Sequence, residues 1–498
     1  MQKEFTQVHE QDSVLITLKD LAKGTAIAYK DREFELLEDI PSGHKIAVHD
    51  LSPGEDIIKY GFPIGHATKE IKRGSWVHTD NVKTNLSGAL EYDYQEINET
   101  NVDIHASEHT FQGYVRKNGE VGIRNEVWII NTVGCINKVA ESLARLENNT
   151  NGDREFDGVH HFPHPFGCSQ LGDDLENTQK LLARLVEHPN AAGVLVLGLG
   201  CENNFIESFK QAMPNFDPER IRFLAAQESE DELEEGLALL DELVDYATSF
   251  EQQPVPISKL KVGLKCGGSD GLSGITANPM VGAFSDLLIS NGGTTILTEV
   301  PEMFGAETIL MDRAKDRVVF DQMVDLINDF KEYFIRHEQP VYENPSPGNK
   351  QGGITTLEEK SLGCVQKGGF ATIVDVLDYG EKVSETGLNL VQGPGNDLVS
   401  VTALAAAGAH IVLFTTGRGT PFGGPVPTVK ISTNSTLYNK KKNWIDYNAG
   451  VLVEGKSMED TRDEFFHYLL DVASGEKRTN NEKNGFREIA IFKDGVML

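Results

Sequence analysis

The sequence is short of cysteine and of positive charge. It has five cysteines in 498 residues, spaced 33, 33, 65 and 98 positions apart, so no Cys-x-x-Cys pair marks a zinc-finger or thioredoxin-type site. Disulfide frameworks are dense and belong to short secreted chains, which excludes that class as well. With 46 Lys and Arg against 76 Asp and Glu, the formal net charge is −30. Without a cationic stripe to neutralise phosphates, no nucleic-acid partner is expected.

Long apolar runs and nucleotide-binding motifs are also missing. No stretch of about 18 apolar residues occurs, so no membrane span is expected. The first residues, MQKEFTQVHEQDSV, lack the basic and apolar regions of a signal peptide, and a reduced cytoplasm is the expected location. GLGCENN and GRGTPFG lack the third glycine of a dinucleotide fingerprint, and no P-loop is present. These incomplete motifs argue against a nucleotide-binding oxidoreductase, which stays open only as a minor alternative function.

The pattern of apolar, polar and turn residues along the chain divides it into three parts and a linker. Residues 1–88 consist of short alternating segments separated by turn signals such as PSGH and SPGED, which predicts a small antiparallel β domain. Residues 89–112 have no clean periodicity and are interpreted as a linker. From residue 113 onwards, apolar strands alternate with amphipathic helices, which predicts parallel sheets in a multidomain α/β protein. We expect a middle domain over 113–255 and a C-terminal domain over 256–498.

Every cysteine is next to glycine. Cys135, Cys168, Cys201 and Cys364 follow a glycine, and Cys266 precedes two. At least three of these positions close an apolar run that is typical of a buried strand: EVWIINTVGC, AAGVLVLGLGC and KVGLKCGG. Ligands of α/β sheets bind outside the carboxyl ends of the strands, where glycine allows close approach and a thiol can bind metal or react. The cysteines therefore predict the edge at which an active site lies.

Several polar segments add candidate ligands. In HHFPHPFGCSQLGDD (160–174), His160 and His164 share one face of an extended chain, which is metal-ligand spacing, although ordinary loop histidines have the same pattern. The loop CGGSDGLSGITANP (266–279) suits a polyhydroxylated ligand, or else is a structural turn. In FTTGRGTP, Arg418 is a natural bidentate partner for a carboxylate, although a solvent-facing arginine is the alternative.

The N-terminal domain concentrates cationic groups in GHKIAV, KYGFPIGHA and WVHTDNVKTN. A domain of this size seldom needs this many cationic groups to fold, which makes it a candidate lid or ligand-completing domain. The alternative interpretation is that these groups are ordinary surface lysines and histidines without a functional role.

Ten motifs together resemble one family. KYGFPIGHA, TVGC, GCSQLGDD, LGLGCENN, CGGSDGLSGITANP, LTEVPEMFGAE, ENPSPGNK, SLGC, PGND and FTTGRGTP occur in the order typical of the altronate/galactarate dehydratase family, closer to the altronate branch. The resemblance implies an N-terminal SAF-type β domain followed by Rossmann-like α/β domains. It also implies dehydration of D-altronate to 2-dehydro-3-deoxy-D-gluconate in galacturonate catabolism, with Fe²⁺, or Mn²⁺ in its place, as activator.

The reaction sets the chemistry to look for. The proton on C2 is removed beside the carboxylate and the C3 hydroxyl leaves, so the site needs concentrated positive charge, a base and an acid. Two metal sites are compatible with this: a mononuclear Fe²⁺, or an iron–sulfur cluster on three of the thiols with one open iron. Cys364 is expected to be a bystander. The candidates are His44, Lys45, His78 and Lys350 for catalysis; Arg124, Asn125, Ser269, Asp270, Thr276, Asn278, Asn349, Thr416 and Arg418 for substrate binding; and His164, Cys168, Cys201, Cys266 and Cys135 for the metal.

Other functions remain open at this point. The substrate could be galactarate, or the protein could bind a sugar acid without turning it over. The expected partner is a small-molecule sugar acid, and a homodimer is the expected assembly.

Overall fold

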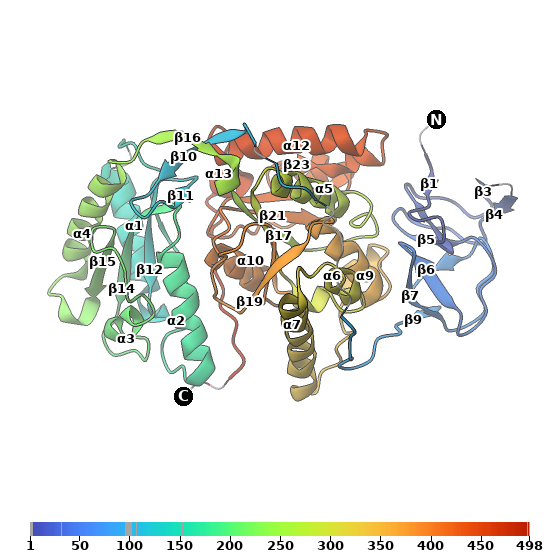
Figure 1. The fold of residues 1–498 in the computed structure, drawn as a ribbon, viewed down its shortest axis with the longest axis horizontal. Helices are drawn as coiled ribbons and strands as arrows, with labels where there is room; N and C mark the ends of the chain where they lie inside the picture. Colours follow the sequence, from blue (N-terminus) through green and yellow to red (C-terminus); the bar gives the residue numbers. More distant parts are fainter. Residues whose placement is uncertain are drawn as a thin grey trace.

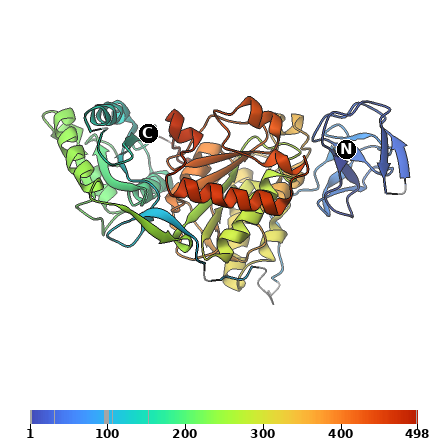
Figure 2. The same cartoon turned by 90° about the horizontal axis from the view of Figure 1, so that it is seen from above.

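The computed structural model describes residues 3–30, 32–94, 102–105, 107–151, 153–495 and 497. Three domains lie in a row, with the C-terminal domain between the other two (Figures 1 and 2). The N-terminal domain therefore packs on the C-terminal domain, although the middle domain follows it in sequence. Within the described ranges, no helix combines the length and the apolar character needed to cross a membrane.

The N-terminal domain is antiparallel β structure, as predicted. Leu15 and Ile46 are fully buried in strands that are covered along their whole length, whereas the outer hairpin buries only Ile27 and Phe34. Two antiparallel sheets and a separate hairpin form it: β1(Phe5–Thr6)-β2(Val14–Thr17)-β5(Lys45–Ala47)-β8(Trp76–Val77), β6(Asp56–Lys59)-β7(Phe62–Ala67)-β9(Val82–Lys83), and β3(Ala26–Tyr29)-β4(Arg32–Glu35).

The segment interpreted as a linker is attached to the C-terminal domain. Tyr92 donates a hydrogen bond to Glu307 at 2.5 Å and accepts one from Lys331 at 2.9 Å. Residues 95–101 and 106 of this segment lie outside the described residues. Strand β10 (Thr110–Val115) begins inside the segment and pairs antiparallel with β16 (Gln252–Pro256). The chain therefore enters and leaves the middle domain through two neighbouring strands.

The middle domain contains the first of the two predicted parallel sheets. Its strand order is β13(Val159–His161)-β12(Glu126–Asn131)-β14(Ala191–Gly198)-β15(Ile221–Ala225), and the short β11 (Val121–Gly122) pairs with β10. Four helices accompany these strands: α1(Asn137–Asn151), α2(Gly172–Val186), α3(Ile206–Lys210) and α4(Glu232–Ala247). Because β12 is followed by β13 on one side and β14 lies on its other side, the strand order reverses between β12 and β14.

The C-terminal domain contains a seven-stranded parallel sheet. Its order is β19(Ile373–Leu377)-β20(Leu388–Val391)-β18(Thr294–Leu297)-β17(Lys261–Cys266)-β21(Ile411–Thr416)-β22(Thr428–Ser432)-β23(Tyr447–Asn448). The helices are α5(Ala277–Ser290), α6(Glu307–Met311), α7(Arg317–Arg336), α8(Pro347–Gln351), α9(Leu357–Cys364), α10(Asp397–Ala406), α11(Ser435–Lys440), α12(Met458–Ala473) and α13(Asn480–Asn484). All of β18 and β21 is buried, as expected for central parallel strands. Here the order reverses between β17 and β21.

Candidate active site

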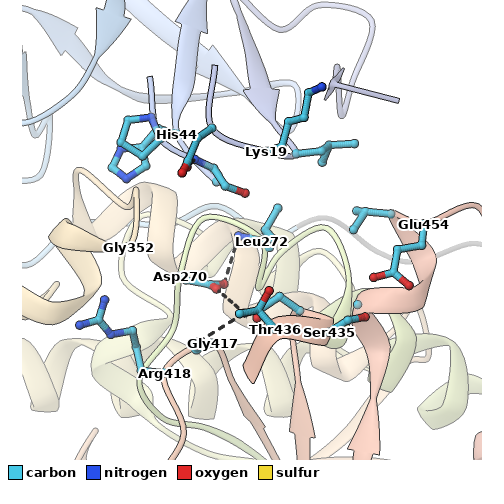
Figure 3. A pocket seen from close by; sticks show the side chains of 18 of the residues that line it. Lys19, His44, Asp270, Leu272, Gly352, Gly417, Arg418, Ser435, Thr436 and Glu454 are labelled. Carbon is cyan, nitrogen blue, oxygen red and sulfur yellow. Dashed lines mark hydrogen bonds between the residues drawn. The ribbon is translucent and has the colours of Figure 1, made fainter. Parts of the chain in front are cut away.

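A pocket of about 410 Å³ lies between the N-terminal and C-terminal domains. Figure 3 shows His44 and Lys19 on the N-terminal side, facing Asp270, Leu272 and Arg418 on the C-terminal side. The last three residues belong to the loops that follow β17 and β21, where the order of the large sheet reverses. Open α/β sheets bind ligands at such a reversal, outside the carboxyl ends of the strands. The N-terminal domain thus supplies one wall of this pocket.

His44 is held as a neutral ring. The indole Nε1 of Trp76 donates to His44 Nδ1 at 3.1 Å, so Nε2 carries the proton and faces the carbonyl oxygen of Gln351 at 3.3 Å. Burial, the charge of Lys45 and the neighbouring His78 lower the pKa of His44 to about 4. At neutral pH this imidazole is a hydrogen-bond donor toward the pocket wall.

His78 lies beside His44. Its ring stacks on Trp76 at a centroid distance of 5.0 Å and packs edge-on against His44 at 5.1 Å. Its Nδ1 is buried and has no hydrogen-bond partner among the described residues. Burial and the charge of Lys45 lower the pKa of His78 to about 4 as well. The structure therefore brings two of the four predicted catalytic residues together.

The other two predicted catalytic residues lie away from the pocket lining. The Lys45 ammonium donates to the Gly353 carbonyl at 2.7 Å and to Glu359 at 2.8 Å, with no exposed surface. Glu359 also accepts from Lys59 at 2.7 Å. Burial lowers the pKa of Lys45 to about 8. We correct the expectation for Lys45, because its bonds are all used in fastening the two domains. Lys350 is half-buried on α8, next to Gln351 of the pocket wall.

Five predicted substrate-binding residues lie in or beneath the pocket. Arg418 is exposed in the cleft and donates to Gln351 Oε1 at 3.0 Å. Asp270 accepts from Thr433 at 2.9 Å and from Ser273 and Asn434, which orders its loop; burial raises its pKa. Asn349 donates to the Ser269 carbonyl at 2.8 Å, and Thr416 accepts from the Gly419 amide at 2.8 Å. The Ser269 hydroxyl is buried and has no hydrogen-bond partner among the described residues.

Four other predicted substrate-binding residues are placed elsewhere. Thr276 and Asn278 are fully buried, where Thr276 donates to the Thr433 carbonyl and Asn278 accepts from Thr415. Arg124 and Asn125 precede β12 and so lie at the amino edge of the middle sheet, opposite the edge where ligands bind. Arg124 is fully buried against Glu482 at 2.7 Å. These four assignments are therefore wrong: the side chains hold loops and domains together.

Two thiols and a carboxylate converge in the C-terminal domain. Cys266 ends β17, Glu302 ends the short helix η4 (Val300–Glu302), and Cys364 ends α9. The two Sγ atoms are 3.4 Å apart, and they donate to Glu302 Oε2 at 3.0 and 3.1 Å. Across the described part of the chain, this is the one group of three potential ligands with all ligand atoms within 4.8 Å. Cys364, expected to be a bystander, is therefore a full member of the cluster.

Three buried lysines surround this cluster. Lys360 donates to Glu302 at 2.6 Å, Lys265 pairs with Glu299, and Lys367 lies 3.5 Å from Glu299. Burial alone would raise the pKa of Glu302, but these three ammonium groups hold it below its usual range. The carboxylate is thus ionised and ready to bind a cation.

The other predicted metal ligands are in the middle domain. Cys135, Cys168 and Cys201 are exposed after β12, β13 and β14, whereas Cys266 and Cys364 are buried in the other sheet. The five predicted ligands therefore do not form one centre. His164 Nε2 lies 2.8 Å from the Asn131 carbonyl and its Nδ1 accepts from the Phe166 amide at 3.2 Å. With both ring nitrogens engaged, His164 is not free to bind a metal.

Comparison with known proteins follows the same three-part division. Family models match residues 3–85 (altronate/galactarate dehydratase SAF domain), 113–248 (D-galactarate dehydratase/altronate hydrolase, second domain) and 257–497 (D-galactarate/altronate dehydratase, C-terminal). The chain is 54% identical to altronate dehydratase of Bacillus subtilis over the full length of both chains. It is 52% identical to altronate dehydratase of Escherichia coli, over 99% of this chain and 100% of the relative. Galactarate dehydratase (L-threo-forming) of E. coli is 32% identical, over 98% of this chain and 96% of the relative.

The chain belongs to the galactarate/altronate dehydratase family. As a member of this family it is a hydro-lyase, built from an N-terminal SAF domain and two parallel α/β domains.

Sequence reasoning missed several residues of this dehydratase's centre. Glu299 and Glu302 lie in the LTEVPEMFG motif, and Lys360 and Cys364 lie around SLGC. One signal was available for the glutamates: they follow the end of a buried strand, as the cysteines do. Glu299 also has φ of 71°, a left-handed conformation that is uncommon for a residue other than glycine. That conformation lets its carboxylate accept the Cys266 amide at 2.9 Å.

Proposed function

We propose that this protein dehydrates D-altronate to 2-dehydro-3-deoxy-D-gluconate and water, as a cytoplasmic step of galacturonate catabolism that requires Fe²⁺. One observation carries the choice of substrate. The two relatives named altronate dehydratase are more than 50% identical over essentially the whole chain, whereas the galactarate dehydratase is 32% identical. The pocket at the reversal of the large sheet is the site that we assign to the sugar acid.

The pocket residues suit a polyhydroxylated acid. Arg418 offers a planar guanidinium to the substrate carboxylate, which a net charge of −30 would otherwise repel. The hydroxyl groups of Ser42, Ser435 and Thr436 in the pocket lining can donate to substrate hydroxyl groups, and the Gln351 carbonyl and Asp270 supply acceptors. His44 closes the pocket from the SAF domain, so the substrate is enclosed only when the two domains are together.

The cluster of Cys266, Glu302 and Cys364 fits a resident Fe²⁺. Two thiolates and an ionised carboxylate are a donor set that binds divalent iron, and the loop that lines the pocket begins at the residue after Cys266. The ion would supply Lewis-acid charge for the enediolate that develops when C2 loses its proton. The lysines around the cluster balance the negative charge of its three ligands.

Proton transfer is assigned to the His44–His78 pair. Both rings are neutral at neutral pH, and His78 Nδ1, which has no hydrogen-bond partner among the described residues, is the atom of the pair that can accept the C2 proton. The imidazolium formed in this way returns the proton to the C3 hydroxyl, which leaves as water, and the resulting enol tautomerises to the 2-keto acid. Lys45 is left out of this step, because its ammonium already makes three short bonds.

The substrate assignment is tested by incubating the protein with Fe²⁺ under reducing conditions. D-altronate, galactarate and D-mannonate are compared, and 2-keto-3-deoxy acid is measured. We expect product from D-altronate with a kcat/KM at least tenfold above the other two. Preferred turnover of galactarate would mean that galactarate, not D-altronate, is the substrate. Tight binding of altronate without product from any of the three acids would mean that the protein binds sugar acids without converting them.

The proton-transfer assignment is tested by His78→Gln. Loss of a general base typically costs 10²–10⁴-fold, so kcat should fall by about that factor while KM changes little. His49 is exposed on the same domain, and His49→Gln is the matched control. A His78→Gln enzyme with the kcat of the control would remove the pair from the mechanism.

A further inference from the structure

Three cysteines outside the pocket occupy the second sheet reversal of the molecule. Cys135 follows β12 and Cys201 follows β14, the two strands between which the order of the middle sheet reverses; Cys168 follows β13, on the other side of β12. Parallel strands end at one edge, so the three thiols lie on the same edge of the sheet, and all three are exposed. The proposed dehydration uses none of them.

Hydrogen bonds join the three loops beside the thiols. The amide of Gly134, next to Cys135, donates to the Phe166 carbonyl at 2.9 Å. The carbonyl of Gly167, next to Cys168, accepts from the Asn204 amide at 3.1 Å. The amide of Ser169, on the other side of Cys168, donates to Asn203 Oδ1 at 2.8 Å. The loops thus form one ordered unit that fixes the positions of the three cysteines.

The same unit holds amide groups that lack partners. Asn131, Gln170 and Asn204 are fully buried, and Asn131 Oδ1, Gln170 Nε2 and Asn204 Oδ1 have no hydrogen-bond partner in the described residues. Asn131 ends β12, Gln170 follows Cys168 by two positions, and Asn204 follows Cys201 by three. Buried polar atoms without partners are rare, and three in one loop cluster indicate a bound group: Gln170 Nε2 can donate to its sulfur atoms, and the two amide oxygens face a site that favours a cation.

We propose that Cys135, Cys168 and Cys201 bind a [4Fe–4S] cluster through three thiolates, with the fourth iron free of a protein ligand. This centre is separate from the dehydration pocket and goes beyond the proposed function. Loading releases three thiol protons, because the ligands bind as thiolates. The start of α1 two residues after Cys135 and the start of α2 four residues after Cys168 favour negative charge at this edge.

The spacing favours a cluster over a single ion. Ligands of one ion must lie close to one another, and across the described residues only the Cys266 group meets a 4.8 Å limit. In a cluster each thiolate binds a different iron, so the sulfur atoms are further apart. His164 and Glu202 do not supply a fourth ligand, since the His164 nitrogens are engaged and Glu202 accepts from Thr132, Leu199 and Gly200.

The test is anaerobic reconstitution of the full-length protein with Fe³⁺, sulfide and a thiol reductant, followed by visible absorption and assays of iron and acid-labile sulfide. We expect about four sulfides per chain. Cys168→Ser and Cys201→Ser should lose the sulfide and the visible absorption, whereas the matched control Cys364→Ser should retain both. Iron without sulfide, or the same loss in Cys364→Ser, would overturn the proposal.

A second measurement covers the case in which a variant fails to fold. In wild-type protein, alkylation under native conditions should modify the three exposed thiols and leave the two buried ones. After reconstitution, those three should be protected, and removal of the iron by a chelator should restore their reactivity. Unchanged alkylation after reconstitution contradicts a cluster at these residues.

Discussion

At the scale of single residues, the outstanding feature is the number of buried charges at the domain contact. Lys45, Lys59 and Glu359 are each at most 1% exposed, and two ammonium groups share one carboxylate. Burial would raise the pKa of Glu359, but the two lysines hold it well below its usual range. The carboxylate is therefore needed to compensate both cations.

Glu359→Gln should destabilise the protein strongly. Removing the charge leaves two buried ammonium groups without a counter-ion, which costs about 3–5 kcal/mol. The free energy of unfolding from urea denaturation measures it. Asp80→Asn breaks the exposed Lys69–Asp80 pair and is the matched control, for which the expected cost is below about 1 kcal/mol. Equal losses in the two variants would contradict this account.

Arg418→Lys should weaken substrate binding. Lysine keeps the charge but cannot form the two parallel hydrogen bonds of a guanidinium, so KM for the sugar acid should rise about tenfold with a smaller change in kcat. Arg336 is exposed and remote from the pocket, and Arg336→Lys is the control. An unchanged KM in Arg418→Lys would remove Arg418 from carboxylate binding.

At the scale of elements, glycines set how closely helices approach the loops around the site. Gly282 on α5 faces η5 (Val365–Gly368), and a Cβ built there would lie 2.1 Å from the Gln366 carbonyl oxygen. Backbone on both sides leaves no flexible group to move. Because η5 directly follows Cys364, this contact also fixes one ligand of the proposed iron.

Gly282→Ala should therefore destabilise the protein, by about 1–3 kcal/mol, as overpacking in a core does. Thermal unfolding measures the change. Gly348 is the control, because it is also helical and its Cβ would meet nothing closer than 4.0 Å; Gly348→Ala should leave the melting temperature unchanged or slightly raised. A melting temperature for Gly282→Ala equal to that of wild type would show that η5 can shift.

The elements were largely predictable from sequence, and the site was predictable only in part. Apolar runs closed by a cysteine next to glycine predicted β12, β14 and β17 and the edge at which the ligands meet, because strand burial is a local pattern. The partnership of Cys266 with Cys364 could not be predicted, since it depends on how α9 packs against η4. Arg124 was misassigned although a signal was present: it precedes the apolar run EVWIIN, so it lies at the amino end of that strand, opposite the edge where ligands bind.

At the scale of the whole molecule, neutral histidines lie at both domain contacts. His44 is at the contact between the SAF and C-terminal domains, and His188 lies 3.1 Å from the Ala409 carbonyl at the contact between the middle and C-terminal domains. Burial lowers the pKa of His188 to about 3 from its ordinary 6.5. The unfolded chain therefore takes up protons at these positions at a higher pH than the folded protein.

Stability should fall as the pH is lowered from about 6.5 to about 4. Each histidine whose pKa is lowered by folding contributes stability that is fully present above pH 6.5. This stability is lost as the pH falls toward the pKa of the folded state, because between these two pH values the unfolded chain binds more protons. We expect His188→Gln to flatten the dependence of the melting temperature on pH over this range, and the exposed His49→Gln to leave it unchanged. Identical slopes in the two variants would refute the role of His188.

The contact of Lys59 with Glu359 also constrains the order in which the domains can associate during synthesis of the chain. The two residues are 300 positions apart, so a ribosome that adds about 5–20 residues per second completes the carboxylate roughly 15–60 s after the lysine. Throughout that interval the SAF domain presents uncovered ammonium groups to water. Those charges oppose premature association with apolar segments of the nascent chain. Docking of the first domain to be synthesised is thereby delayed until the third has been synthesised at least as far as Glu359.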